Sequence, residues 1–416
     1  MNDLTKQQIR QTLRETKTKR RSQRCRVFTL KIDHSRLSVK EKERLKMFFV
    51  EAKWLYNDVL ASNDPFHYSY KNIIVTVFNK DKQPEQKTLT TLPARVRYDI
   101  IKRVRRAIAA LSKAKKAGQK VGKLKFKSDC SSIEFYCFKH NIVGHNRVKI
   151  SGIKRHLVVR GLKQIQDHYE LANAKLLKKP SGYYIAITCY EFITINILNN
   201  TKEAGVDFGI RSNLTTSDGE VFNVSVEESE RLKLLQRKLA RQKKSSNDSY
   251  KTKLLIRREY EKLTNRKIDA ANKIVHTLLT NYSFIYIQDE NLKGWHSDVR
   301  HSRAVQHSCM GLIKSKLARS SKVKVISKWC PTTKQCYICN RMNILTLSDR
   351  VYKCECGLEE DRDVKAAKTI MAFGKGQLSY ARTIRKQVRV PMERREFKSA
   401  EKMTSKTQAV RLDVSS

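Results

Sequence analysis

Three acidic residues stand at the margins of apolar elements, where their carboxylates could hold metal ions. Asp207 ends one predicted strand, Glu290 ends a second, and Asp363 opens a helix predicted over 361–373. A single aspartate at a strand end is usually a turn or cap residue, but three such acids in a strongly basic chain are a better candidate. Two Mg²⁺ held about 3.5–4 Å apart by carboxylates can activate water and stabilise the leaving 3′-oxygen of a phosphodiester. We therefore predict that the three acids are catalytic and bind two Mg²⁺.

Four cysteines form the most specific local pattern in the chain. Cys336 and Cys339 are separated by two residues, and Cys354 and Cys356 by one, with fourteen residues between the pairs. Two such pairs predict a zinc ribbon, in which four thiolates hold one Zn²⁺ tetrahedrally at about 2.3 Å. The zinc would stabilise the fold without implying catalysis. Cys330, six residues before the first pair, is interpreted as a strand-end residue rather than a ligand.

The composition points to a polyanionic partner. The chain has 416 residues with 87 Lys and Arg against 40 Asp and Glu, a formal net charge of +47, which excludes the surface of an ordinary metabolic enzyme. Such a chain repels itself when compact unless nucleic acid neutralises it. Apolar residues make up 40% of the chain, enough for the cores of several domains. Without an apolar stretch of membrane length or a signal peptide, we predict no membrane partner and a cytoplasmic, nucleoid-associated protein.

Apolar periodicity predicts the elements of the first half. They are a basic arm at 1–25 that is loose until bound, a strand at 25–33, helices at 38–64 and about 94–117, and short strands from about 121 to 200, among them K-L-K-F-K-S, R-V-K-I-S-G-I, H-L-V-V-R-G-L and G-Y-Y-I-A-I-T-C-Y-E-F. Ser38 is placed to cap the first helix. Together the strands could close a small barrel or sandwich around the helical block.

The second of these helices carries a basic face. We predict that Arg95, Arg103 and Arg106 contact nucleic-acid phosphates. A solvated basic face is an equally good explanation for each of them.

The second half has a different order of elements. It contains a strand into Asp207, a tight turn at Ser217-Asp218-Gly219, two long basic helices at about 226–243 and 250–281, a strand at 284–292, a helix at about 302–318 and a strand at 323–329. A ribonuclease-H-like fold requires this order, strand, hairpin, helix, strand and helix, with acids at these positions.

Four motifs follow one another in this half. They are G-V-D-F-G-I at 205–210, Q-D-E-N-L-K-G-W at 288–295, P-T-T-K-x-C-x-x-C at 331–339 and C-G-L-E-E-D-R-D-V-K-A-A-K at 356–368. They resemble the TnpB (OrfB) family, insertion-sequence-encoded, RNA-guided DNA endonucleases related to the type V CRISPR effectors. The resemblance covers most of the chain from about 40 to 373, with W-L-Y-N, L-P-A-R and F-K-S in the first half.

The resemblance implies a multidomain α/β fold. A RuvC-like (ribonuclease-H-like) nuclease domain would contain an inserted zinc ribbon, and an N-terminal β-barrel-like (wedge) domain would contain an inserted helical recognition domain. The implied segments are a basic arm and first wedge strand at 1–38, the helical recognition domain at 39–120, the wedge β-domain at 121–200, the nuclease at 201–328 and 358–375, the zinc ribbon at 329–357 and a basic flexible tail at 376–416.

The resemblance also implies that Asp207, Glu290 and Asp363 are the first, second and third RuvC carboxylates. Two alternatives stay open. Asp289 competes with Glu290, because many relatives place the acid directly after the strand. Asp361 competes with Asp363, although Asp361 is also the predicted N-cap of the last helix.

A relative of this kind binds a guide RNA copied from its transposon end and cuts double-stranded DNA beside a short transposon-adjacent motif. Base pairing reads the sequence while the protein reads backbone shape, which agrees with the surplus of positive charge. The implied cofactors are two catalytic Mg²⁺ and one structural Zn²⁺, and a monomer is favoured.

Two other functions remain open. Lys365 stands where the family commonly has asparagine, and we expect it beside the metals, where it would reduce activity or contact the scissile strand. A nuclease-weakened, RNA-guided DNA-binding repressor is therefore one alternative. A transposase with the same fold is the other, and it would join DNA ends without a guide.

Overall fold

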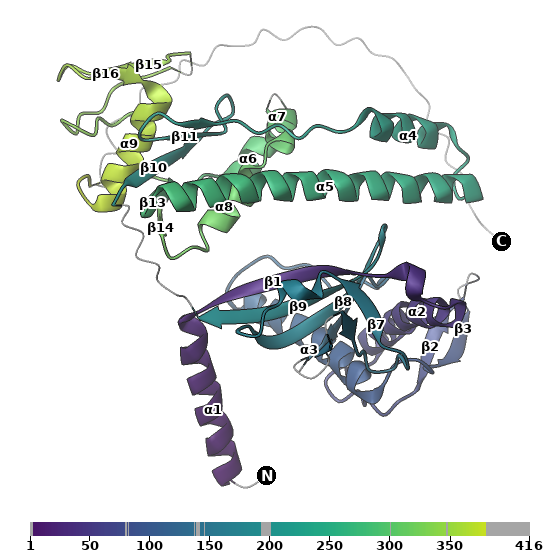
Figure 1. Cartoon of the computed structure of the whole chain (residues 1–416). Coiled ribbons are helices and arrows are strands. Elements are labelled where there is room, and N and C mark those ends of the chain that lie inside the picture. Colours follow the sequence, from purple (N-terminus) through teal and green to yellow (C-terminus); the bar gives the residue numbers. More distant parts are fainter. Residues whose placement is uncertain are drawn as a thin grey trace. The chain divides into compact units, whose positions relative to one another are not determined.

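The computed structural model describes residues 3–79, 81, 83–136, 138, 142–144, 146–192, 201–299, 301–346 and 348–379. Contacts divide the chain into two units, one from 1–199 and 226–270 and the other from 200–225 and 271–416. The division near 200 lies at the predicted boundary between the wedge and nuclease domains. Residues 226–270, predicted as part of the nuclease, are grouped with the first unit. Figure 1 labels the elements of both units.

An antiparallel sheet of seven strands forms the centre of the first unit, in the order β4-β8-β9-β1-β7-β6-β5. The strands are β1 (Gln23–Ile32), β4 (Ser132–Phe135), β5 (Ile142–Val143), β6 (Arg147–Val148), β7 (Leu157–Arg160), β8 (Glu170–Lys179) and β9 (Gly182–Phe192). Val27 of β1 pairs with Thr188 of β9, so the N-terminal strand joins the strand-rich region as predicted. Among the described residues, no pairing closes β4 onto β5 to complete the predicted barrel.

Two helices and a hairpin are inserted between β1 and β4. They are α2 (Val39–Ala61), β2 (Ile74–Phe78), β3 (Pro84–Thr88) and α3 (Ala94–Lys116). The two helices agree with the predicted ones, but the hairpin was not predicted. Ser38 caps α2 in a reciprocal capping box with Glu41, which fixes the start of the helix. Phe48 and Phe49 of α2 are buried in the core that this block shares with the sheet.

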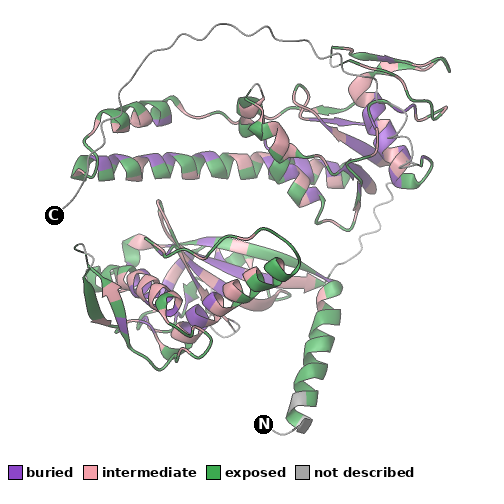
Figure 2. Ribbon diagram, turned by 180° about the vertical axis from the view of Figure 1, so that it is seen from behind, coloured by how far each residue is buried: buried purple, intermediate pink, exposed green. Residues whose placement is uncertain are grey.

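The N-terminal arm differs from its prediction. Instead of a loose segment, Asp3–Arg21 forms helix α1, and Figure 2 shows it exposed along most of its length. Only its end is tied to the sheet: Lys19 and Arg20 form ion pairs of 2.9 and 2.8 Å with Glu170 of β8. The arm lacks an apolar face, so the apolar periodicity that predicts most helices was missing here.

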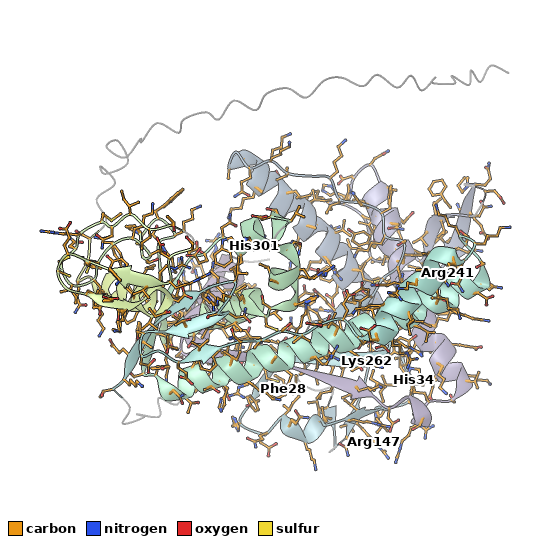
Figure 3. All side chains as sticks on the ribbon, turned by 90° about the horizontal axis from the view of Figure 1, so that it is seen from above. Phe28, His34, Arg147, Arg241, Lys262 and His301 are labelled. Atoms are coloured by element: carbon orange, nitrogen blue, oxygen red, sulfur yellow. The ribbon has the colours of Figure 1, made fainter. Side chains whose placement is uncertain are left out.

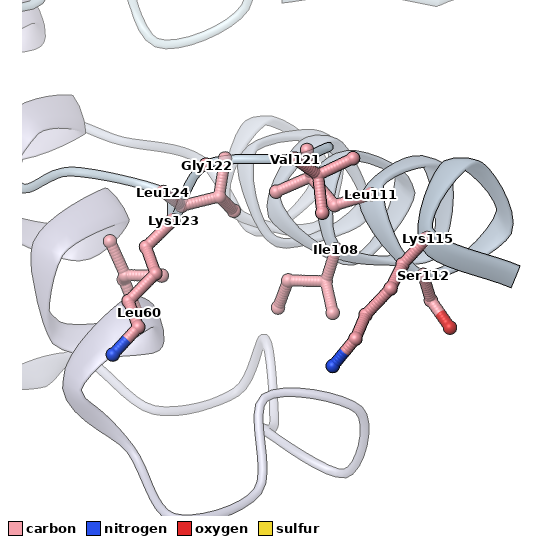
Figure 4. Close-up of a pocket in the computed structure, with 9 residues that line it drawn as sticks. All are labelled: Leu60, Ile108, Leu111, Ser112, Lys115, Val121, Gly122, Lys123 and Leu124. Atoms are coloured by element: carbon pink, nitrogen blue, oxygen red, sulfur yellow. The ribbon is translucent and has the colours of Figure 1, made fainter. Parts of the chain in front are cut away.

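The predicted strand K-L-K-F-K-S, at 123–128, is not a strand. Its residues alternate between apolar and charged, yet they take part in no ladder among the described residues. Residues 121–124 instead lie beside the ends of α2 and α3, where with Leu60, Ile108 and Leu111 they line an apolar cavity of about 450 Å³ (Figure 4). Its lining contains no carboxylate, so this cavity lacks the chemistry predicted for the catalytic site.

The second unit is built on a five-stranded sheet of order β12-β11-β10-β13-β14. The strands are β10 (Glu203–Phe208), β11 (Leu214–Thr216), β12 (Val221–Phe222), β13 (Phe284–Gln288) and β14 (Val323–Ile326). β10, β13 and β14 are parallel, whereas β11 is antiparallel to β10 and β12. This is the strand and hairpin order predicted for the second half. The carboxyl ends of parallel strands meet at one edge, where α/β sheets place their ligands.

Helices and a small hairpin complete the described chain. They are η1 (His34–Arg36), η2 (Leu162–Gln164), α4 (Glu230–Arg241), α5 (Asn247–Asn281), α6 (Leu292–Ser297), α7 (Ser302–His307), α8 (Met310–Leu317), β15 (Val351–Lys353), β16 (Glu359–Asp361) and α9 (Arg362–Lys375). The helix predicted over 302–318 is interrupted because Ser308 is extended. No described helix combines the length and apolar character needed to cross a bilayer. The predicted tail beyond residue 379 lies outside the described residues.

Asp218, in the turn between β11 and β12, accepts hydrogen bonds from three sides. The donors are Lys202 Nζ at 2.5 Å, Thr216 Oγ1 at 2.5 Å and the Tyr282 hydroxyl at 2.8 Å. Burial alone would raise the pKa of Asp218, but these hydrogen bonds outweigh it and lower the pKa to about 2. The charged carboxylate therefore stabilises the fold of the second unit.

Replacing Asp218 by asparagine should lower the free energy of unfolding by about 1–2 kcal/mol near neutral pH, because the lowered pKa is itself a contribution to stability. The folded pKa lies below the ordinary value of 3.8. The contribution is therefore present above about pH 4 and is lost as the pH falls towards about 2. Urea unfolding of both chains across this range measures the difference. A difference that does not shrink on acidification would contradict the assignment.

Candidate active site and metal centre

Asp207 lies on the face of β10 that is covered by α9. Val206 and Phe208 on either side of it are buried in the core, and Gly205, two residues earlier, shares its face. A Cβ at Gly205 would lie 1.9 Å from the carbonyl oxygen of Ala367, so the helix crosses the strand in direct backbone contact (Figure 1). Asp207 follows Gly205 by two residues, and Asp363 precedes Ala367 by one helical turn. The strand and the helix therefore bring Asp207 towards the end of α9 that carries Asp363.

Gly205→Ala is expected to destabilise the second unit by about 3 kcal/mol, at the upper end for overpacking, because backbone rather than a flexible side chain blocks the added methyl group. Chemical denaturation of the full chain measures the loss. Gly311→Ala is the matched control, since nothing lies within 4 Å of the added Cβ in helix α8. It should be neutral or stabilising by about 0.5–1 kcal/mol. Equal effects of the two variants would contradict the close approach of α9 to β10.

Glu290, rather than Asp289, faces the candidate site. Asp289 is 62% exposed and forms a 2.7 Å ion pair with Lys314 of α8. The next residue, Glu290, is half-buried, and burial raises its pKa against the opposing charge of Lys314. Gln288, the last residue of β13, is buried and hydrogen-bonded to the carbonyl oxygens of Ser327 and Cys330. The turn after β13 is therefore held in place, and Glu290 rather than Asp289 lines the candidate site.

Asp363 and Asp361 have different roles. Asp361 is exposed and caps α9, its Oδ1 accepting from the backbone N–H groups of Asp363 at 2.8 Å and Val364 at 3.1 Å. The predicted N-cap is thus confirmed. Asp363 lies one turn before the contact with Gly205 and lines the same cavity as the other two acids. Asp361 is not part of that lining.

The three predicted acids line one cavity of about 370 Å³. Its other walls are formed by Phe208, Gly209, Trp295, Thr332, Thr333, Lys334, Leu345, Thr346, Arg362 and Ala366. Burial, followed by the charges of Asp363 and Glu290, raises the pKa of Asp207 to about 8. Protein atoms surround Asp207, although part of its side chain is exposed to solvent. The cavity thus concentrates negative charge, and a hard cation with oxygen ligands would relieve the repulsion.

Lys365 does not lie where we expected it. Its side chain is fully buried, and its Nζ donates to the carbonyl oxygens of Thr332 at 3.1 Å, Thr333 at 3.0 Å and Gln335. The Nζ also lies 3.9 Å from the centre of the Tyr352 ring, and burial lowers its pKa to about 8. Lys365 is absent from the cavity lining, so the expectation that it contacts metals or the scissile strand is wrong.

The four predicted cysteines form a compact cluster. Their sulfur atoms all lie within 4.8 Å of one another, with 3.8 Å between Cys336 and Cys356 and 3.5 Å between Cys339 and Cys354. These distances exceed a disulfide bond of about 2.05 Å. They match the edge of a tetrahedron around a zinc ion with sulfur ligands at about 2.3 Å, which is about 3.8 Å.

The backbone around the cluster is shaped for such a metal. Gly357 has φ +90°, which lets the chain turn sharply after Cys356. The backbone N–H of Cys356 and the side chain of Asn343 lower the pKa of Cys354 to about 6, favouring the thiolate that binds zinc. Cys330 is not part of the cluster. Within the described part of the chain, the four cysteines are the one group of three or more His, Cys, Asp or Glu side chains close enough to share a metal ion, and the three acids do not form such a group.

The three predicted arginines of α3 have different surroundings. Arg103 Nη1 donates to the backbone oxygen and hydroxyl of Ser132, both at 3.1 Å, which favours a role in anchoring α3 to β4. Arg95 and Arg106 are exposed, and the guanidinium of Arg106 lies 5.1 Å from the Tyr136 ring centre. Basic side chains also cover α4 and α5, where Arg241 and Lys262 are labelled in Figure 3.

Other residues of the cavity were not identified from the sequence. Arg362 Nε lies 3.5 Å from Asp363 Oδ1, and its charge opposes the rise in the pKa of Asp207. In the sequence, the position of Arg362 between Asp361 and Asp363 could have identified it as a residue of the site. Trp295, in α6, ends the motif that contains Glu290, but nothing in its spacing predicts that it lines the cavity.

Two family models match the chain in order. The model described as a probable transposase, OrfB_IS605, matches residues 188–296, which include Asp207 and Glu290. The Cas12f1-like TNB domain matches residues 310–370, which include the cysteine cluster and Asp363.

Curated relatives share 28–29% identity with parts of the chain. A putative RNA-guided DNA endonuclease of Streptomyces pristinaespiralis is 28% identical over 201 residues, 46% of this chain and 50% of the relative. Putative transposase R186 of Acanthamoeba polyphaga mimivirus is 29% identical over 211 residues, covering 44% and 43%. The putative RNA-guided DNA endonuclease InsQ of Escherichia coli K12 is 28% identical over 120 residues, covering 28% and 30%. The chain thus spans half or less of the length of these relatives.

A solved complex of Cas12f1 with sgRNA and target DNA matches with a TM-score of 0.41 and 12% identity, covering 67% of this chain and 71% of that one. The family resemblance read from the motifs rests instead on the two family matches and on the relatives. An OrfB_IS605 match is followed by a Cas12f1-like TNB domain, and two relatives carry the name of putative RNA-guided DNA endonucleases; these matches support the resemblance of the chain to TnpB-type proteins.

Proposed function

We propose that the chain is a transposon-encoded, RNA-guided DNA endonuclease that cuts double-stranded DNA beside a short transposon-adjacent motif. The observation that carries this proposal is the convergence of Asp207, Glu290 and Asp363, from three distant segments, on one cavity. The names of the Streptomyces and Escherichia coli relatives support it. The net charge of +47 suits a protein that holds RNA and DNA backbones.

In this proposal the cavity is a RuvC-like site in which the three acids bind two Mg²⁺. The three acids line the same cavity, and a pair of ions about 3.5–4 Å apart is the arrangement that this chemistry uses. Bound there, the ions would activate the attacking water and stabilise the leaving 3′-oxygen. Asp207 is the most enclosed ligand, and its raised pKa marks the position with the greatest need for a positive charge. Arg362 holds the Asp363 carboxylate from the side.

The remaining partners follow from the same proposal. The guide RNA comes from the transposon end, the target is double-stranded DNA, and the cysteine cluster holds one structural Zn²⁺. Arg95 and Arg106 keep the exposed positions that phosphate contacts need. The protein acts as a monomer in the cytoplasm, at the nucleoid.

Two competing functions have different standing. The repressor depended on Lys365 lying beside the metals, and its burial away from the cavity removes that reason. A transposase is favoured by the description of the OrfB_IS605 model and by the name of the mimivirus relative. A transposase would join DNA ends in a strand-transfer assay without bound RNA, whereas the proposed nuclease would not.

The decisive experiment combines RNA identification with cleavage. The full chain is expressed with its flanking DNA and purified, and the bound RNA is sequenced. The complex is then mixed with Mg²⁺ and plasmids that contain the matching target beside randomised sequence. We expect linear product from matched plasmids carrying one flanking motif, and none with EDTA. Equal cleavage of unmatched plasmids, or active protein free of RNA, would refute the proposal.

A further inference from the structure

Lys365 is a buried cation whose hydrogen-bonding capacity is fully used. An ammonium group has three donors, and here they meet the carbonyl oxygens of Thr332, Thr333 and Gln335. The face of the Tyr352 ring, 3.9 Å away at its centre, supplies a further favourable contact. Burying a charge is costly unless it is paired in this way. The arrangement therefore fixes the backbone that supplies the three oxygens.

That backbone connects the two sites of the second unit. Thr332, Thr333 and Lys334 line the acid cavity, and Gln335 directly precedes the zinc-cluster residue Cys336. The segment is also held from its other side. Thr332 Oγ1 donates to Gln288 Oε1 at 2.9 Å, and Gln288 Nε2 donates to the Cys330 carbonyl oxygen at 2.8 Å. Residues 332–335 are thus held between the end of β13, which leads to Glu290, and α9, which carries Asp363.

We propose that Lys365 is a positioning residue: it fastens residues 332–335 to α9, so that the cavity wall, the first cysteine pair and Asp363 keep one fixed arrangement. Lys365 is not catalytic, because it does not line the cavity. Its effect on cleavage rests on the proposed nuclease function, whereas its effect on the cysteine cluster does not.

Lys365→Met tests the proposal, because it keeps an unbranched side chain of similar length and removes all three donors. Lys375→Met is the matched control. It lies ten residues further along α9, is exposed, and pairs with Glu203 at 2.8 Å instead of with the segment. Each variant is assayed as the full chain with its guide RNA for zinc release to a chelator, the absorption spectrum of the Co²⁺-substituted cluster, target-DNA affinity and single-turnover cleavage.

For Lys365→Met we expect zinc release to be faster and DNA cleavage to be slower than in the wild type, each by about tenfold or more. The Co²⁺ spectrum should be altered and the DNA affinity unchanged. Lys375→Met should resemble the wild type. Slower cleavage with wild-type zinc release and spectrum, or wild-type behaviour throughout, would overturn the proposal. If the wild type cleaves no DNA, the nuclease function fails, yet zinc release and the spectrum still decide the role of Lys365.

A second variant covers the case in which Lys365→Met does not fold. Lys365→Gln keeps two of the three donors on a slightly shorter side chain, so it can satisfy only part of the set. Zinc release faster than in the wild type and slower than in an unfolded cluster is expected, together with a partial loss of cleavage. Wild-type values for both would overturn the proposal, because two donors cannot hold three carbonyl oxygens.

Discussion

Replacing Asp207 by asparagine should reduce single-turnover DNA cleavage by more than about 100-fold, while guide-RNA and target-DNA affinity stay unchanged. The side chain keeps its shape but loses the charge that would bind Mg²⁺. Mutating a residue that only hydrogen-bonds to a metal ligand already lowers activity or metal affinity by about 10–100-fold, so mutating a ligand itself should lower activity further. Burial, followed by the charges of Asp363 and Glu290, also raises the pKa of Asp207 to about 8. Cleavage kinetics and filter-binding on the same complex measure both properties.

Asp289→Asn is the matched control for this prediction. It makes the same chemical change on a neighbouring acid that is 62% exposed, paired with Lys314 and outside the cavity. An exposed ion pair contributes at most about 1 kcal/mol, so cleavage should fall by no more than about fivefold. If Asp289→Asn abolished cleavage and Asp207→Asn did not, the assignment of the acids would be wrong, and the alternative left open after β13 would be restored.

The parts of the fold and of this site that were predictable share local signals. Ser38 with Glu41 sets the start of α2, and Asp361 sets the start of α9, because capping depends on residues within one helical turn. Asp207 was found because it ends a predicted apolar strand. Its meeting with Asp363, however, depends on Gly205, whose missing side chain admits α9. The motif contained the glycine, but sequence alone did not show what it contacts.

The errors in prediction come from interactions between distant residues. Lys365 is charged, and a charged residue beside an acidic motif suggests an exposed or metal-facing position. Its burial requires three carbonyl oxygens that lie 30–33 residues away in the sequence, which no local pattern reveals. The segment 123–128 has strand-like alternation but forms no ladder, because a strand also needs a partner. Register and side-chain direction thus limit what periodicity can predict.

Cys354→Ser should remove the zinc from the purified chain and also abolish most cleavage. Structural zinc supplies about 10–16 kcal/mol of apparent folding free energy in small domains, so the hairpin of β15 and β16 should not stay folded without it. Leu345 and Thr346, between the cysteine pairs, line the acid cavity, and the first pair directly follows residues 332–335. Loss of the cluster should therefore disturb two walls of the cavity. Zinc content by atomic spectroscopy, thermal unfolding and cleavage are the measurements.

Cys330→Ser makes the same chemical change six residues before the first pair. Cys330 is half-buried but lies outside the cluster, so its sulfur has no part in metal binding. The variant should keep one zinc per chain and lose stability only through a small core defect, of about 1 kcal/mol. Because Gln288 is held by the backbone oxygen of Cys330 rather than its side chain, the turn before Glu290 should also persist. Zinc loss in Cys330→Ser, or zinc retention with full cleavage in Cys354→Ser, would show that the four-cysteine site is misassigned.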